Sequence, residues 1–207
     1  MKFLWLFALA VFACGCATDP VEINLYGATY HEDAAVELSP LVEAVTPEIM
    51  PGDGLRALVL PFAVRQDVAV RKDVGRELGD IFRLAWLESR IFSALEYDPA
   101  QPWPGLDQAL ALAKARGANV LITGNVSQFF EGGGTGRTSI GATVEVHWVP
   151  TSTLIWSAAQ AAMMEGQPDK DYVVVRTTRR LPDHPTYAVM RGLAVSMARS
   201  FARFVQE

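Results

Sequence analysis

The chain has 207 residues, half of them hydrophobic, and a net charge of −5. This length suits one globular domain with a buried core plus appendages. The acidic balance excludes a basic field that attracts nucleic acid over the whole surface. Cys14 and Cys16 are the two cysteines and the three histidines are scattered, which excludes a zinc site of the usual Cys/His spacing. We therefore expect no nucleic acid, no metal and no cofactor.

The amino terminus has the layout of a secretory signal. Lys2 supplies a positive charge, residues 3–12 are uninterruptedly apolar, and small residues precede a cysteine. An apolar core of roughly ten residues is too short for a permanent membrane helix, which needs about twenty. Polar sequence with a proline follows at once, which argues against a buried core helix.

The sequence Gly15-Cys16-Ala17 resembles the end of a bacterial lipoprotein signal. The resemblance implies that Cys16 is acylated and becomes the first residue of the mature chain, with residues 1–15 removed. Cys14, which follows Ala13, is the alternative site. Ala17, in place of an aspartate, resembles the outer-membrane sorting class. Because more than one acyl chain makes such an anchor stable, we expect a protein anchored in the outer membrane and facing the periplasm.

Residues 16–53 are predicted to be the lipidated cysteine and a tether. This segment holds Pro20, Pro40, Pro47 and Pro51, many acids and no long periodic pattern. Residues 41–50 could form a helical turn or two. The alternative is that part of the segment packs on the domain as an extra edge strand.

Residues 54–207 are predicted to form a periplasmic α/β domain. Apolar residues at three- and four-residue spacing predict helices, and alternating or uninterrupted apolar runs predict strands. The predicted strands are residues 55–64, 91–97, 120–130, 139–149 and 153–162, and the predicted helices are residues 72–90, 104–116 and 186–206. The resulting order βαβαβββα predicts a mixed sheet covered by helices.

The stretch 117–130 is the predicted centre of the sheet. Gly117 ends a helical pattern, as a C-terminal cap does. The uninterrupted run Val120-Leu121-Ile122 indicates a strand buried on both faces. The imperfect alternation that follows, with Phe129 as its exception, predicts a half-exposed end that leads into a hairpin.

Two phrases carry a family resemblance. They are Ala-Leu-Val-Leu-Pro-Phe at residues 57–62 and the helix–glycine–strand phrase at residues 113–126. They resemble the group of periplasmic lipoprotein domains that includes the curli-secretion protein CsgG, the penicillin-binding-protein activator LpoB and the amino-terminal domain of TolB. The resemblance covers about residues 55–205 and implies fold far more than function. Pore-forming members insert long hairpins into the membrane, whereas the arms around residues 132–136 must also build this domain's sheet.

Few residues point to chemistry. The glycine-rich turn at residues 132–136 has the wrong spacing for a phosphate loop. Glu145 and His147 share a strand face, but no nucleophile or third group joins them, so we read them as a solvent-facing pair and assign no catalytic residue. The predicted loop at residues 165–185 joins an apolar triplet to arginines, a mix enriched at interfaces. The candidate partner-binding residues are Val173, Val174, Val175, Arg176, Arg179 and Arg180. A solvated loop edge is the alternative.

These features favour a non-enzymatic, lipid-anchored periplasmic accessory protein. It would bind another envelope protein and support the assembly or regulation of an envelope machine. A subunit of a CsgG-like secretion pore is the alternative, and an envelope hydrolase is a third hypothesis. The sequence leaves the partner and the oligomeric state open.

Overall fold

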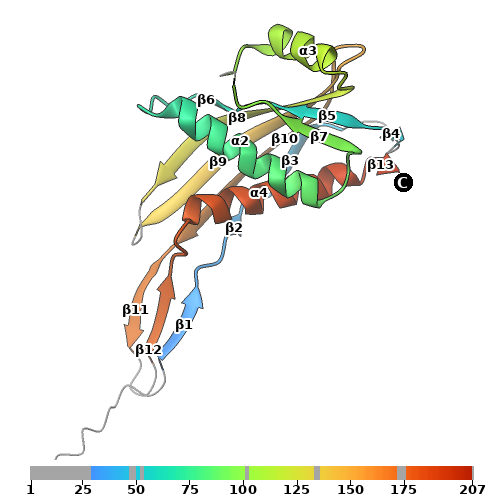
Figure 1. Cartoon of the computed structure of the whole chain (residues 1–207). Helices are drawn as coiled ribbons and strands as arrows, with labels where there is room; N and C mark the ends of the chain where they lie inside the picture. Colours follow the sequence, from blue (N-terminus) through green and yellow to red (C-terminus); the bar gives the residue numbers. More distant parts are fainter. Residues whose placement is uncertain are drawn as a thin grey trace, which may run out of the picture.

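The computed structural model describes residues 29–46, 50–51, 54–100, 103–132, 136–171 and 176–206 (Figure 1). Three helices lie within these ranges: α2 (Arg71–Glu88), α3 (Leu106–Ala115) and α4 (Pro185–Ala202). The longer strands of the main sheet are β5 (Arg56–Val59), β7 (Ala94–Tyr97), β8 (Val120–Glu131), β9 (Arg137–Trp148) and β10 (Thr153–Glu165). The remaining strands are β1 (Thr29–Asp33), β2 (Glu37–Leu38), β3 (Val42–Val45), β4 (Met50–Pro51), β6 (Ala63–Val64), β11 (Gln167–Asp171), β12 (Arg176–Arg180) and β13 (Val205–Gln206).

An eight-stranded mixed sheet forms the body. Its order is β2-β10-β9-β8-β5-β7, with β3 also paired to β10 and β6 to β8. β8 lies parallel to β5 on one side and antiparallel to β9 on the other, as predicted for the centre of a mixed sheet. The parallel strands need long crossovers, which α2 and α3 supply, whereas only a few residues separate β8 from β9 and β9 from β10. α2 and α4 cover one face of the sheet and α3 covers the other (Figure 1).

Both faces of the central strands are buried. Val59 and Ile122 point into the larger core under α2 and α4. Their neighbours Leu58 and Leu121 point into a smaller core under α3, because successive strand residues face opposite sides. The larger core is rich in aromatic rings, and the Trp86 ring lies 5.5 Å from that of Phe201 on α4. The predicted α/β class is therefore confirmed, with short strands added before β5 and after β10 that the predicted order lacks.

A bulge explains the broken alternation of β8. The pairing register with β9 shifts between Val126 and Gln128. One extra residue in a strand moves every later side chain to the opposite face. Phe129 therefore packs against the larger core, and Phe130 is 51% exposed. At the other end Gly117 adopts φ +68° just after α3, which confirms the predicted helix stop.

The prediction of a helical turn or two at residues 41–50 is wrong. Val42–Val45 forms strand β3, which pairs antiparallel with β10 beside β2. Ala34 is buried in the larger core, and a side chain at Gly192 of α4 would come within 3.0 Å of Val36. The alternative of an edge strand packed on the domain is thus what residues 34–45 adopt. Pro47, inside the predicted range, disfavours a continuous helix, and β10 offers an edge with which β3 can pair.

The predicted loop at residues 165–185 is also wrong in part. β10 extends to Glu165, and β11 and β12 follow it as an antiparallel pair. β1 joins β12 in parallel, which gives a second sheet of order β1-β12-β11. This sheet, which we call the arm, extends from the body below α4 (Figure 1). Its strands are too polar to show an apolar period, and one of its pairings joins segments far apart in the sequence.

Two further boundaries differ from prediction. The strand expected at residues 55–64 is interrupted after Val59 and resumes as β6. Pro61, which has no donor for a ladder hydrogen bond, lies in the interruption. The last helix ends at Ala202, and Val205–Gln206 pairs with β4 as β13.

Candidate functional site

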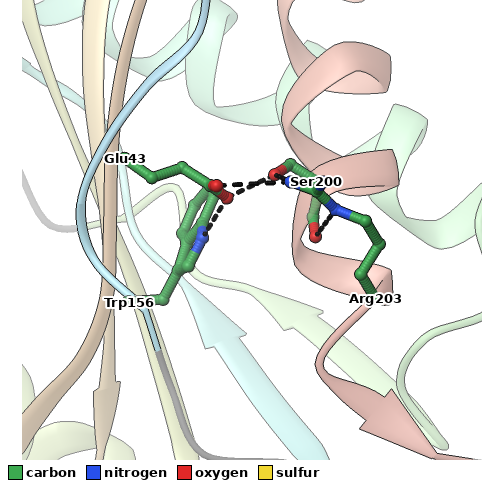
Figure 2. Close-up of polar contacts among 4 residues, drawn as sticks. All are labelled: Glu43, Trp156, Ser200 and Arg203. Carbon is green, nitrogen blue, oxygen red and sulfur yellow. Dashed lines mark hydrogen bonds and ion pairs between the residues drawn. The ribbon is translucent and has the colours of Figure 1, made fainter.

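A polar junction fastens the edge strand β3 to the body (Figure 2). Glu43 accepts a hydrogen bond from Trp156 Nε1 at 3.1 Å and another from the Ser200 hydroxyl. Arg203 Nη2 donates to Glu43 Oε2 at 3.2 Å and to Ser200 Oγ at 2.6 Å. β3, β10 and α4 therefore meet at one carboxylate. An inward-pointing charge on an edge strand also discourages other strands from adding to that edge.

The Glu43 junction is mostly buried. The carboxylate side chain is 20% exposed, while the Trp156 indole is fully buried. Burial raises the pKa of Glu43, but hydrogen bonds from Ser200 and Trp156 and the charge of Arg203 outweigh it. The pKa is held below its ordinary value of 4.5. The charged form is thus the one that holds the strand in place.

The outer surface of α2 and α4, which we call the helical face, carries two grooves. A groove of about 540 Å³ lies between α4 and the residues around Leu38, and one of about 450 Å³ lies between α4 and the end of α2. Arg191, Val195 and Arg199 line both grooves, so they form a ridge along α4 between them. The spacing of four residues places these side chains on one side of the helix.

The α2 side of the helical face carries exposed leucines among charges of both signs. Leu84 and Leu87 are 37% and 48% exposed although the opposite side of α2 is packed into the core. Glu77 and Glu88 lie on the same side as these leucines, at spacings of four and seven residues. Glu88 also pairs with Arg191 of α4 at 2.7 Å, which closes the seam between the two helices. The helical face thus joins an α2 half with exposed leucines and mixed charge to an α4 half with arginines and grooves.

The arm holds part of the predicted partner-binding set. Arg176, Arg179 and Arg180 lie on β12, whereas Val173, Val174 and Val175 lie outside the described residues. In register, Arg179 and Arg180 are placed opposite Glu32 and Asp33 of β1, and Arg176 opposite Asp171 of β11. The arginines are therefore set in a strand between acid-bearing neighbours and not on a free loop. Their role in partner binding stays a prediction.

His147 and Glu145 were predicted to form a solvent-facing pair. This is wrong for His147, which is buried, whereas the side chain of Glu145 is 44% exposed. His147 is 3% exposed, and its Nε2 lies 3.3 Å from Glu145 Oε2. α3 and its core residues cover this part of the sheet, and His147 lies opposite Leu121 in register. The buried Nδ1 of His147 has no hydrogen-bond partner within the described ranges. Within the described ranges, the hydrogen bond of the His147 side chain is the one to Glu145.

Neither metal chemistry nor a membrane helix is evident in the described residues. They contain no group of three or more His, Cys, Asp or Glu placed to hold a metal ion. None of the helices in these ranges combines the length and apolar character needed to cross a bilayer.

Sequence reasoning missed the Glu43 junction and the helical face. The contacts of Glu43 join residues 113 and 157 positions apart, which no local pattern shows. The only signal for the helical face was the interruption of the apolar pattern of the last helix by arginines. The apolar pattern of α2 predicted its packed side, and it did not mark Leu84 and Leu87 as exposed.

Comparison with known proteins shows the fold. No family model and no curated protein matches the chain. The structure of a PelC dodecamer from Paraburkholderia phytofirmans matches with a TM-score of 0.52 at 14% identity, over 80% of this chain and 98% of that chain. The chain is therefore similar in fold to nearly the whole of a PelC subunit.

Two proteins of the predicted resemblance also match, more weakly. The LpoB C-terminal domain from Salmonella enterica matches at a TM-score of 0.33 and 14% identity, over 57% of this chain and 84% of that chain. TolB from Acinetobacter baumannii matches at 0.30 and 14% identity, over 59% of this chain and 25% of that chain. LpoB and TolB are thus among the structural matches, and the resemblance to CsgG stays a prediction. Because these TM-scores are low, the likeness in fold rests on the comparison with PelC.

Proposed function

We propose that this chain is a lipid-anchored accessory protein of the bacterial outer membrane. Cys16 carries the lipid, the domain faces the periplasm, and it acts by binding another envelope protein and not by catalysis. The observation that carries this proposal is the arm, a sheet that stands apart from the body. The outer edges of β1 and β11 have no partner strand among the described residues. Such edges can take up a strand from another protein through backbone hydrogen bonds.

The arginines of β12 supply charge to the same region. Arg176, Arg179 and Arg180 balance the two acids of β1 and the single net negative charge of β11. A carboxylate-bearing strand of a partner that replaced β1 or β11 would lie directly beside the arginine positions of β12. Arginine is enriched at interfaces, where its planar guanidinium group can donate two parallel hydrogen bonds to one carboxylate.

The test is a triple change of Arg176, Arg179 and Arg180 to Ser. We expect the protein to stay folded and anchored, and its complex with the envelope partner to weaken. The partner is captured by crosslinking in intact cells and quantified for the wild-type and variant proteins, and salt dependence is compared. A triple change of the exposed Arg65, Arg71 and Lys72 to Ser removes the same charge from the body and serves as control. A folded arm variant that captures the same amount of partner with the same salt response would remove the arm from consideration.

A second candidate function is a subunit of a many-copy assembly, which includes the secretion-pore hypothesis. It is favoured by the likeness in fold to PelC, whose structure is that of a dodecamer. The lipidated protein, extracted in mild detergent, is measured by native mass spectrometry. A ring of many copies would favour the assembly, and a complex of one or two copies with another protein would favour the accessory role. An envelope hydrolase stays the third hypothesis, addressed by a turnover screen on envelope substrates.

A further inference from the structure

We propose that the outer edge of β6 is a docking site for an extended segment of another protein, one that carries an acidic side chain next to an apolar one. The proposal goes beyond the function proposed for the arm and does not depend on it. It rests on a strand edge that is open within the described residues, a pocket against that edge, and two cations that line the pocket.

The outer edge of β6 presents free backbone groups. β6 lies beside the start of α2 (Figure 1) and pairs in parallel with β8 on one side, while no strand of the described ranges pairs with its other side. Arg65 N donates to Val126 O, so the N–H and C=O of Val64, one residue earlier, point away from β8. A strand from a partner can form hydrogen bonds with both groups.

The helix α2 already uses the preceding outward position of the chain. Phe62 N donates to Gly75 O at 2.9 Å, and a side chain at Gly75 would overlap Phe62 O. The glycine therefore allows α2 to pack directly on the backbone of Phe62, which fixes the start of β6 in place. The outward groups of Val64 are thus presented by a rigid element, which lowers the entropic cost of binding.

A pocket of about 260 Å³ lies against this edge. Its lining combines residues 61–64 with Arg71, Lys72 and Trp103. Val64 packs against the larger core and Trp103 against the smaller one, so the pocket spans the edge of the sheet from one face to the other. Its volume falls below the roughly 300–1,000 Å³ of most small-molecule sites. The pocket is therefore suited to anchor side chains of a larger partner.

The lining of the pocket is positively charged. It contains two cations and no acid, and Arg71 and Lys72 are exposed and form no ion pair within the described ranges. The neighbouring acid Asp73 is paired with Arg76 at 3.2 Å, and Asp67 lies in the connection before α2, outside the lining. Charge complementarity therefore selects a partner with a carboxylate and disfavours a basic one.

The two sides of the pocket set the order of side chains in the partner. Successive residues of a strand point to opposite faces of its sheet. A partner residue that points toward α2 meets Arg71 and Lys72, and its neighbour points toward Trp103. The segment therefore places an acidic residue directly beside an apolar one, and an aromatic ring packs best on the indole.

The test is a titration of the full mature chain in detergent with a synthetic peptide, acetyl-Thr-Thr-Glu-Phe-Thr-Thr-amide, followed by nuclear magnetic resonance. A short edge, one apolar anchor and an exposed ion pair predict a dissociation constant of about 0.1–1 mM. The amide signals of Ala63, Val64 and Arg65 and the indole N–H signal of Trp103 should shift on binding. Shifts confined to another part of the protein would overturn the proposal.

Variants of the peptide separate the contributions while the protein stays unaltered. Replacing Glu by Gln should weaken binding about threefold or more at low salt, and this difference should vanish at high salt. Replacing Phe by Ala should weaken binding about tenfold or more. Edge pairing uses the N–H groups of alternate residues, so N-methylation at either Glu or Phe, but not both, should weaken binding about fivefold or more.

Variants of the protein locate the charge. Arg71→Ser with Lys72→Ser should abolish the difference between the Glu and Gln peptides. Lys114→Ser with Arg199→Ser removes two exposed cations elsewhere on the body and should preserve that difference. Circular dichroism checks that both variants are folded. Equal binding of the Glu and Gln peptides to the wild type at low salt would overturn the proposal.

Other occupants of the site give other outcomes. If neither N-methylated peptide is weakened, or if acetate alone causes the same shifts, the site takes a simple anion and not a strand. If the Val64 signal moves with protein concentration in the absence of peptide, the occupant is a second copy of this chain. Each of these results would overturn the proposal. Capture of the envelope partner by the arm should be unchanged by Arg71→Ser with Lys72→Ser, so failure of this site is distinguishable from failure of the proposed function.

Discussion

Removal of the Glu43 carboxylate tests whether β3 is part of the folded body or a loosely attached tether. In Glu43→Ala the fully buried Trp156 indole keeps its N–H but loses its acceptor. A buried donor left without a partner costs about 1–3 kcal/mol. Arg203 is 64% exposed, so its ion pair adds only about 0–1 kcal/mol. The expected loss of unfolding free energy is therefore about 1–4 kcal/mol.

The assay is urea denaturation of the mature chain followed by far-ultraviolet circular dichroism. Arg203→Ala is the matched control, because it removes the exposed partner and leaves the buried donor satisfied. It should cost no more than about 1 kcal/mol. In a Trp156→Phe background, Glu43→Ala should cost less than in the wild type, since the orphaned donor is already gone.

Hydrogen exchange locates the effect. Amides of Val42–Val45 should exchange faster in Glu43→Ala, while those of β8 at the sheet centre should change only through global stability. If Glu43→Ala costs no more than Arg203→Ala and leaves β3 equally protected, Glu43 does not hold the strand. The segment would then be the tether that its composition suggested.

Three further outcomes are expected. Ile122→Asp places a carboxylate in a site that is 0% exposed, so it should cost several kcal/mol or force the added group to stay protonated; a thermal midpoint close to wild type would contradict the burial of β8. Cys16→Ser should abolish acylation and recovery with membranes, whereas membrane recovery lost in Cys14→Ser and kept in Cys16→Ser would move the lipid site to Cys14. Because its folded-state pKa is lowered, charged Glu43 stabilises the fold above pH 4.5 and this stabilisation is lost as the pH falls through and below that value. Stability measured from about pH 6 to about pH 3 should thus fall more in wild type than in Glu43→Gln, and equal slopes would rule out the lowered pKa.

The sequence by itself determined the elements whose signal is local. The apolar spacing of α2 follows directly from the core that it covers, with Leu78 and Phe82 fully buried as the pattern requires. The run from Val120 to Ile122 has no polar residue because helices cover both faces of β8 at this point. All three side chains are fully buried. Gly117 marks a helix end because its positive φ is difficult for other residues. Periodicity and caps act within a few residues, so they can be read without the fold.

Only the tertiary structure decided the features that depend on distant partners. β3 is a strand because it pairs with β10, and β1 is a strand because it pairs with β12. The polar composition of these strands leaves no apolar periodicity from which they could be predicted. The bulge near Gln128 reversed the faces of Phe129 and Phe130, although the residues themselves give no signal for it. Glu43 looked like one of many acids in a tether, and it became a junction when β10 and α4 brought Trp156 and Ser200 to it. The helical face likewise arises when two helices, separated in the chain by most of the sheet, come to lie side by side, because long-range packing sets which exposed residues become neighbours.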